Sequence, residues 1–236
     1  MTVHTIVSNE RISEGIYLMT VEGQFQARMG QFFMLRAWDR EPILSRPISI
    51  FNVEENAIQF LYKVAGEGTR MFARLRAQDQ IQLEGPFGNG FPEVTGKTAL
   101  VGGGIGVAPL LYTAKQLKDK PDIYLGFRGQ SYLTEMYEPY ANELNVTVNG
   151  NLLEDLDLAK YDQVFVCGPL GMMKAVALKG EGLDTDIYVS FEKRMACGIG
   201  ACYVCSVMNK EKNKKVCSDG PVFHAQEVEW HAELSL

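Results

Sequence analysis

Residues 97–120, KTALVGGGIGVAPLLYTAKQLKDK, contain the pattern that decides the fold of this chain. An apolar run ends in a cluster of glycines, and a segment with helical periodicity follows. Glycines at such a turn allow backbone N–H groups and the helix N-terminus to approach a pyrophosphate. The third glycine of the usual G-x-G-x-x-G pattern is missing, and glycine-rich turns also serve plain packing. The stretch therefore predicts a strand–loop–helix unit and favours a nucleotide site at Gly102, Gly103, Gly104 and Gly106.

The residues that follow repeat the alternation of strand and helix. DIYLGFRG (122–129) and QVFVCGP (163–169) are typical of buried strands, and LGMMKAVAL (170–178) is typical of a helix. Such alternation indicates a parallel, doubly wound sheet, so we predict an α/β domain over residues 94–189. No Asp ends the strand at 122–127, and the neighbouring Arg128 suits a 2′-phosphate, so the residues leave NAD and NADP both open.

The residues before this unit, 1–93, show the pattern of short strands. Apolar or alternating runs such as IYLMTVEG (16–23) and AIQFLYKVAG (57–66) are separated by glycines, which predicts a small antiparallel barrel or sandwich. In RPISI (46–50), Arg46 is suited to a pyrophosphate and Ser49 to the edge of a flavin ring. On its own, however, this run is better explained as an ordinary strand with a surface Arg.

Four of the five cysteines lie in the C-terminal part, residues 190–236, where no element looks long enough to be stable alone. Cys197, Cys202, Cys205 and Cys217 give the pattern C-x4-C-x2-C-x11-C, which matches plant-type [2Fe–2S] spacing. Glycines between the first two cysteines suit a loop that curls closely around a cluster. A four-thiolate zinc site is the alternative, although it more often uses two C-x2-C pairs. The fifth, Cys167, lies on an apolar strand, where a buried cysteine is the simpler interpretation.

The composition and net charge of the chain exclude some classes of binding partner. Hydrophobic residues make up 46% and charged residues 22% of the chain, and the formal net charge is -6 with no long basic run. We therefore expect neither nucleic acid nor a membrane as a partner. The N-terminal residues lack the apolar core of a signal peptide, and clustered cysteines suit a reducing compartment, so we expect a cytoplasmic protein. The three histidines are scattered, and no catalytic acid–base or nucleophile group is predicted.

The order of these parts resembles the ferredoxin-reductase superfamily over essentially the whole chain. RPIS, GEGT (66–69), GGGIGVAP and CGP occur in sequence, and a cysteine loop follows them. EKRMACGIGACYVC and KVCSDGPVF are particularly similar to the electron-transfer subunits of class 1B dihydroorotate dehydrogenase, the PyrK family. The resemblance implies an FAD-binding β-barrel at 1–93, an NAD-binding α/β domain at 94–189 and a [2Fe–2S] segment at 190–236.

The resemblance also implies roles for individual residues. The FAD residues would be Arg46, Pro47, Ile48, Ser49, Leu61, Tyr62, Lys63, Gly68 and Thr69. The NAD residues would be Gly102, Gly103, Gly104, Gly106, Cys167, Gly168 and Pro169, which moves Cys167 towards a nicotinamide-side position. The cluster ligands would be Cys197, Cys202, Cys205 and Cys217.

The implied partner is a catalytic subunit that holds FMN and oxidises dihydroorotate to orotate, in a heterotetramer with two copies of each chain. Electrons would run from that FMN through the cluster and FAD to NAD+, because a flavin can exchange either one or two electrons. The chain alone would be an NADH diaphorase. Two alternatives remain: a subunit of a hydrogenase or of an NADH-dependent ferredoxin:NADP oxidoreductase, and a zinc-stabilised binding module without enzymatic activity.

Overall fold

The computed structural model describes residues 1–210 and 212–233. The N-terminal part is one antiparallel sheet of seven strands in the order β4-β3-β7-β1-β2-β6-β5. Their bounds are β1 (Thr2–Ser13), β2 (Ile16–Glu22), β3 (Phe32–Arg36), β4 (Arg46–Ser49), β5 (Asn52–Glu54), β6 (Ala57–Lys63) and β7 (Gln80–Phe87). Strands β4 and β6 contact each other although they are not neighbours in the order, so the sheet curls around its core.

The alternation of apolar and polar residues in the sequence determines which side chains form the core of this first domain. Alternate residues of β2, β6 and β7, among them Met19, Phe60 and Ile81, point inward. The short helix α1 (Glu67–Phe72) covers the core and contributes Phe72, which stacks on Trp38 with 5.6 Å between ring centroids. The domain thus buries one face of a curled sheet, as the strand pattern predicted.

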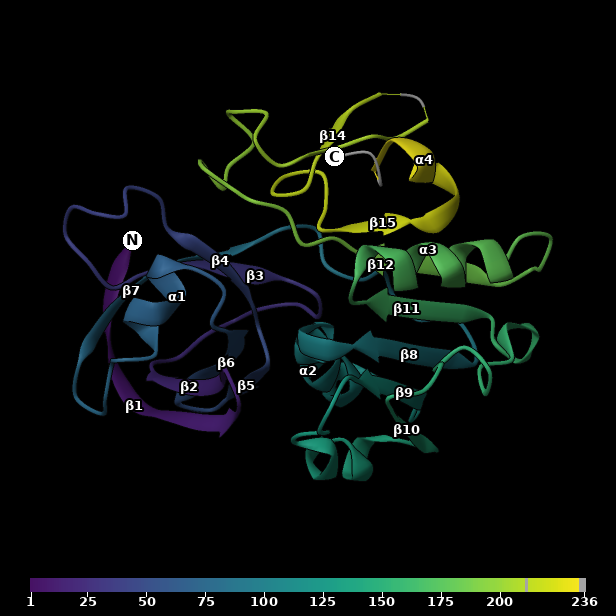
Figure 1. The fold of residues 1–236 in the computed structure, drawn as a ribbon, viewed down its shortest axis with the longest axis horizontal. Helices are drawn as coiled ribbons and strands as arrows, with labels where there is room; N and C mark the ends of the chain where they lie inside the picture. The colour runs from purple at the N-terminus through teal and green to yellow at the C-terminus, as the bar shows by residue number, and fades with distance from the viewer. Residues whose placement is uncertain (211, 234–236) are drawn as a thin grey trace.

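The second domain is a six-stranded sheet in the order β10-β9-β8-β11-β12-β15 (Figure 1). All pairs are parallel except the last. The strands are β8 (Thr98–Gly103), β9 (Asp122–Phe127), β10 (Leu144–Val148), β11 (Gln163–Cys167), β12 (Asp186–Ser190) and β15 (Val222–His224). The helices are α2 (Ala108–Gln116) and α3 (Leu170–Lys179), with 3₁₀ turns η1 (Gly104–Val107), η2 (Thr134–Met136), η3 (Glu138–Tyr140) and η4 (Leu158–Lys160).

Successive residues of β8 face opposite sides of this sheet, and this places the two helices. Leu100 packs in one core with Leu110 of α2, whereas Val101 packs in another with Val176 of α3. The sheet is therefore covered on both faces, which confirms the predicted doubly wound arrangement. Among the helices of the described residues, none is both long and apolar enough to cross a membrane.

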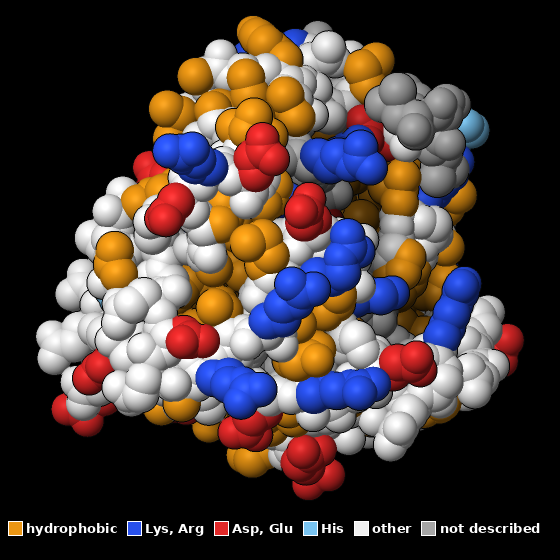
Figure 2. Space-filling model, turned by 60° about the vertical axis from the view of Figure 1, so that its left-hand side comes forward, with side chains coloured by type: hydrophobic (Ala, Val, Ile, Leu, Met, Phe, Trp, Pro, Cys, Tyr) orange, Lys and Arg blue, Asp and Glu red, His pale blue; other side chains and the backbone are white. Residues whose placement is uncertain are grey.

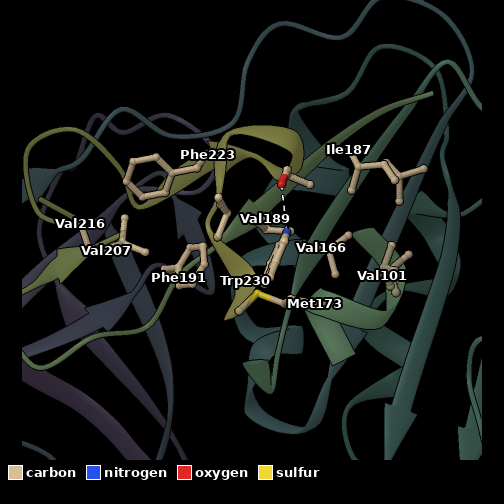
Figure 3. Close-up of a cluster of buried hydrophobic side chains, with 14 of the residues drawn as sticks. Val101, Val166, Met173, Ile187, Val189, Phe191, Val207, Val216, Phe223 and Trp230 are labelled. Carbon is tan, nitrogen blue, oxygen red and sulfur yellow. Dashed lines mark hydrogen bonds between the residues drawn. The ribbon is translucent and has the colours of Figure 1, made fainter. Parts of the chain in front are cut away.

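The C-terminal segment has little regular structure and is held by packing against the second domain. Its elements are β13 (Ser206–Val207), β14 (Lys214–Lys215), β15, η5 (Ala225–Glu227) and α4 (Trp230–Glu233). Val207, Phe223 and Trp230 share one core with Val189 and Met173 (Figure 3). Burial of a single large apolar side chain contributes about 1.5 to 3 kcal/mol, so these few contacts stabilise the segment substantially.

The two main domains also share a core. Phe51 and Leu61 of the first domain lie in the same buried cluster as Leu100 and Leu110 of the second. The domains are further joined by the side chain of Lys115 in α2, whose Nζ donates to Asn52 Oδ1 at 2.6 Å. The apolar contact between the two domains fixes the positions of the strand ends that form the candidate site.

Candidate cofactor sites

A cleft of about 1640 Å³ lies between the two main domains. Its wall includes residues at the carboxyl ends of β8, β9 and β11, where ligands bind in open parallel sheets. The first domain contributes Arg11 and Glu14, at the end of β1, and Lys63, at the end of β6. Of the predicted NAD residues, Gly103, Gly104, Gly106, Gly168 and Pro169 line this cleft.

The two glycine-containing turns of the cleft touch backbone to backbone. A Cβ atom added at Gly106 would lie 2.5 Å from the carbonyl oxygen of Cys167 and from Cα of Gly168. A Cβ at Gly103 would lie 2.5 Å from Met172 Sδ. The glycines are therefore needed for packing, and they also leave a cleft wall of backbone groups that a pyrophosphate could approach.

Two predicted NAD residues lie beneath the cleft rather than along its wall. Gly102 and Cys167 pair across β8 and β11, and a Cβ at Gly102 would lie 2.9 Å from Leu110 Cδ1. Burial raises the pKa of the Cys167 thiol well above its ordinary value, with Glu192 adding to the rise. Cys167 is thus a neutral, buried thiol directly before Gly168.

The three predicted FAD motifs come together on the first domain. Strand β4 carries RPIS and contacts β6, which carries Leu61, Tyr62 and Lys63. A Cβ at Gly68 in α1 would lie 2.6 Å from Arg46 Nε. The four residues of β4 are all half-buried, so Pro47, Ile48 and Ser49 are accessible in part.

The environment of Arg46 suits an anion. Its guanidinium lies 5.3 Å from the centroid of the Trp38 ring and donates to the carbonyl oxygen of Leu44. Burial lowers its pKa, and the nearby Glu67 opposes that shift. Since an Arg stays charged at such a site, Arg46 presents a fixed fork of donors beside α1.

Other predicted FAD residues use their side chains within the protein. Leu61 and Tyr62 are buried, and the Tyr62 hydroxyl donates to Asn9 Oδ1 at 3.0 Å. The Thr69 hydroxyl accepts from the backbone N–H groups of Ala65 and Gly66 at 2.9 and 3.0 Å. Any contact of Leu61 or Tyr62 with a flavin would therefore use the backbone, whereas Lys63 is exposed.

Sequence reasoning missed the charged residues that follow β12. Glu192 and Lys193 line the cleft, where the surrounding protein raises the pKa of Glu192 by desolvation. Lys193 pairs with the buried Glu233 at 2.5 Å, and Glu233 also accepts from the backbone N–H of Met208 at 2.6 Å. These contacts join the cleft to the C-terminal segment, and no local sequence motif predicts them.

The four clustered cysteines form two pairs. The Sγ atoms of Cys197 and Cys202 lie 3.4 Å apart. Cys205 and Cys217 come together at the hairpin of β13 and β14, where the backbone N–H of Val216 donates to the Cys205 carbonyl oxygen at 3.0 Å. The Cys217 side chain also contacts Cys205, so residues separated in sequence are paired by the hairpin.

The loop between the first two cysteines presents N–H groups to the sulfurs. Gly198 and Gly200 have φ values of +70° and +78°, a conformation that glycine adopts without strain. Donors from the loop, first Cys202 and then Ile199, lower the pKa of Cys197 to about 6. Burial raises the pKa of Cys217 to about 12, although Gly200 N–H donates to its Sγ at 3.2 Å.

This donor set fits a two-iron cluster better than one zinc ion. A [2Fe–2S] cluster takes four thiolates, two on each iron, which corresponds to the two observed pairs. Within residues 1–210 and 212–233, no group of three or more His, Cys, Asp or Glu side chains is placed to hold one metal ion. The N–H groups directed at the sulfurs also suit an anionic cluster.

Comparison with known proteins agrees with this geometry. Residues 192–229 match the family described as the iron–sulfur cluster binding domain of dihydroorotate dehydrogenase B. The dihydroorotate dehydrogenase B (NAD(+)) electron transfer subunit of Clostridium acetobutylicum is 42% identical over 237 residues, covering 96% of both chains. The same subunit of Clostridium perfringens is 40% identical, covering 95% of this chain and 96% of its own. The chain belongs to this family of electron transfer subunits.

Solved structures confirm the ferredoxin-reductase-like fold of this family member. A chain from a structure of an NADH-dependent reduced ferredoxin-NADP oxidoreductase, studied for flavin-based electron bifurcation, superposes with a TM-score of 0.87 at 29% identity. The match covers 100% of this chain and 92% of that one. A flavohemoglobin from Malassezia yamatoensis, solved with FAD and heme, shares the fold at a TM-score of 0.65 and 19% identity, over 77% of this chain and 57% of its own. The alternative function, as a subunit of a hydrogenase or of an NADH-dependent ferredoxin:NADP oxidoreductase, is not favoured. The dihydroorotate dehydrogenase B relatives are more similar to this chain in sequence.

Proposed function

We propose that this chain is the electron-transfer subunit of an NAD-dependent dihydroorotate dehydrogenase in pyrimidine biosynthesis. When bound, its [2Fe–2S] cluster and FAD would carry electrons from the FMN of a catalytic subunit to NAD+. The observation that carries the proposal is the paired arrangement of four thiols in the segment matched by the dihydroorotate dehydrogenase B cluster family.

Different residues of the chain would bind FAD and NAD. Arg46 would hold the FAD pyrophosphate, with Ser49 near the isoalloxazine and the backbone of β6 alongside it. The turns at Gly104 and Gly168 would receive the NAD pyrophosphate through backbone N–H groups. Lys63, exposed in the same cleft, would stand where the two binding sites meet.

The proposed partner supplies the chemistry of the substrate. The sequence predicts no acid–base or nucleophile group for dihydroorotate, so its oxidation is assigned to an FMN-containing subunit, in a heterotetramer with two copies of each chain. We expect the assembly to work in the cytoplasm, where the five free cysteines of this chain would stay reduced. Alone, the chain would act as an NADH diaphorase.

An anaerobic visible spectrum of the purified chain, recorded before and after addition of NADH, tests the proposal. We expect flavin absorption with a broad iron–sulfur contribution, and both should bleach with NADH. Addition of the FMN subunit should then allow dihydroorotate to reduce NAD+. A colourless protein with stoichiometric zinc after anaerobic iron and sulfide reconstitution would contradict the proposal.

A further inference from the structure

The side chain of Lys215 contacts the cluster loop, residues 197–205, from the neighbouring hairpin. Lys215 lies on β14, and its Nζ donates to the carbonyl oxygen of Gly200 at 2.8 Å. The same Nζ lies 5.0 Å from the centroid of the Tyr203 ring. Because the N–H of Gly200 donates to Cys217 Sγ at 3.2 Å, one glycine residue links the ammonium group to a cluster thiol.

In the described part of the chain, the ammonium group of Lys215 forms no ion pair with a carboxylate. Asp219 Oδ2 accepts from the backbone N–H of Lys215 at 2.7 Å rather than from its ammonium group. The side chain is half-buried, so water screens its charge less than that of a fully exposed lysine.

The positive charge of Lys215 would interact with the negatively charged cluster. The four thiolates and two sulfides of a [2Fe–2S] cluster outweigh the charge of its two iron ions, so the cluster is an anion, and its negative charge grows by one when it takes one electron from a reduced flavin, with no bond made or broken. A fixed cation beside the loop stabilises the reduced form more than the oxidised form. Charge and hydrogen bonding around the sulfurs are among the factors that set such potentials.

We propose that Lys215 is a positioning residue that raises the reduction potential of the [2Fe–2S] cluster by holding its ammonium group against Gly200 and Tyr203. The proposal rests on the proposed function, since it requires the cluster. It assigns to Lys215 a role in the isolated chain, separate from any contact with a partner subunit.

The test is a redox titration of the isolated holoprotein, with the cluster followed by electron paramagnetic resonance and FAD by absorbance. Lys215→Met keeps most of the aliphatic stem and removes the charge. We expect the equilibrium constant for cluster reduction to fall about tenfold, which is about 59 mV for a one-electron couple, with little change at FAD. Lys215→Arg should stay close to wild type.

Lys214→Met is the matched control. Lys214 is the adjacent residue of β14, so its side chain points to the opposite face of the hairpin, and it is half-buried like Lys215. We expect a much smaller shift from this variant. An unchanged potential in fully loaded Lys215→Met, or an equal shift in Lys214→Met, would overturn the proposal.

Iron and sulfide analysis keeps the test decisive if the neutral variant loses its cluster. Loss in Lys215→Met and Lys215→Gln with retention in Lys215→Arg would support the need for positive charge, whereas loss in all three would contradict it. A wild-type chain that takes up no cluster would instead contradict the proposed function.

Discussion

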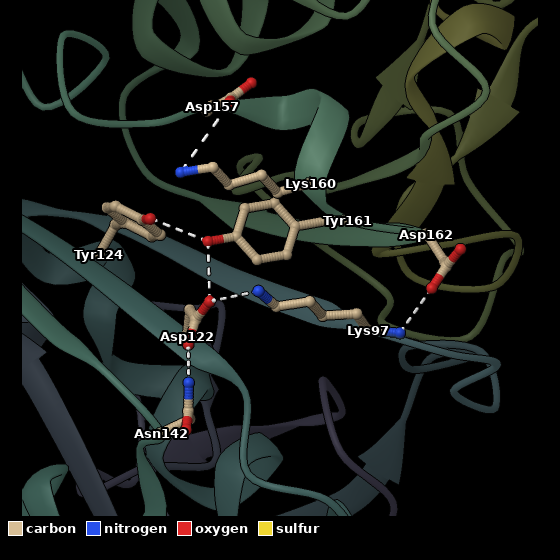
Figure 4. A network of polar contacts seen from close by, with 8 residues as sticks. All are labelled: Lys97, Asp122, Tyr124, Asn142, Asp157, Lys160, Tyr161 and Asp162. Carbon is tan, nitrogen blue, oxygen red and sulfur yellow. Dashed lines mark hydrogen bonds and ion pairs between the residues drawn. The ribbon is translucent and has the colours of Figure 1, made fainter.

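At the scale of single residues, Asp122 has the clearest dependence on protonation. It is buried at the start of β9 and accepts from Asn142 at 2.6 Å and from the Tyr161 hydroxyl at 2.9 Å, and it pairs with Lys97 at 3.4 Å (Figure 4). Burial alone would raise its pKa, but the three partners together lower it below the ordinary value of 3.8. A lowered pKa means that the stabilisation is complete above the unfolded pKa and is lost as the pH falls through the folded pKa.

We expect Asp122→Asn to lower the free energy of unfolding by about 1 to 3 kcal/mol near neutral pH. Urea unfolding of the holoprotein, followed by release of FAD fluorescence, measures this difference. The loss should be the same at about pH 7.5 and about pH 5.5, since both lie above the unfolded pKa. A loss that already shrinks between these two conditions would show that the carboxyl pKa is not lowered. Asp157→Asn is the control, because the exposed pair of Asp157 and Lys160 at 3.9 Å should contribute little.

At the scale of elements, the contact between two turns governs the nucleotide cleft. Gly106→Ala would place a methyl group 2.5 Å from backbone atoms of Cys167 and Gly168, so one turn must move. We expect the KM for NADH in diaphorase assays to rise at least about tenfold, with FAD and iron content unchanged, and a loss of about 1 to 3 kcal/mol in stability. Gly171→Ala is the control, because a Cβ at Gly171 on the same cleft wall meets nothing within 4 Å. Equal effects of the two variants would show that the contact is unimportant.

The sequence predicts elements whose signals are local. The positions of the glycines and the spacing of the cysteines are properties of consecutive residues, so a cluster-binding segment can be predicted from the sequence alone. The pairing of β15 with β12 cannot, because Val222 and Phe223 form a strand only by packing on a sheet built by distant residues. The contact of Glu233 with Lys193 and Met208 escapes prediction for the same reason.

At the scale of the whole molecule, the cluster segment presents an apolar surface. Ile199, Tyr203, Val204 and Met208 are 63%, 70%, 55% and 38% exposed. The segment lies at the top of Figure 1, and hydrophobic side chains gather at the top of the face shown in Figure 2. Apolar side chains beside the four cysteines are suited to a protein interface, so we expect the FMN subunit to dock over this loop.

The docking prediction can be tested with Tyr203→Glu, which places a charge in the centre of that surface. We expect assembly with the FMN subunit, measured by analytical ultracentrifugation, to weaken at least about tenfold, because the variant replaces an aromatic ring in the contact by a carboxylate that must lose its water. FAD content should be unchanged, since Tyr203 lies on the cluster loop rather than on the FAD strands. Val146→Glu on β10 is the control, because Val146 is 41% exposed at the far edge of the second sheet. Equal loss of FAD and assembly in Tyr203→Glu would contradict the placement, since the variant would then disturb the fold rather than the contact through which electrons must enter.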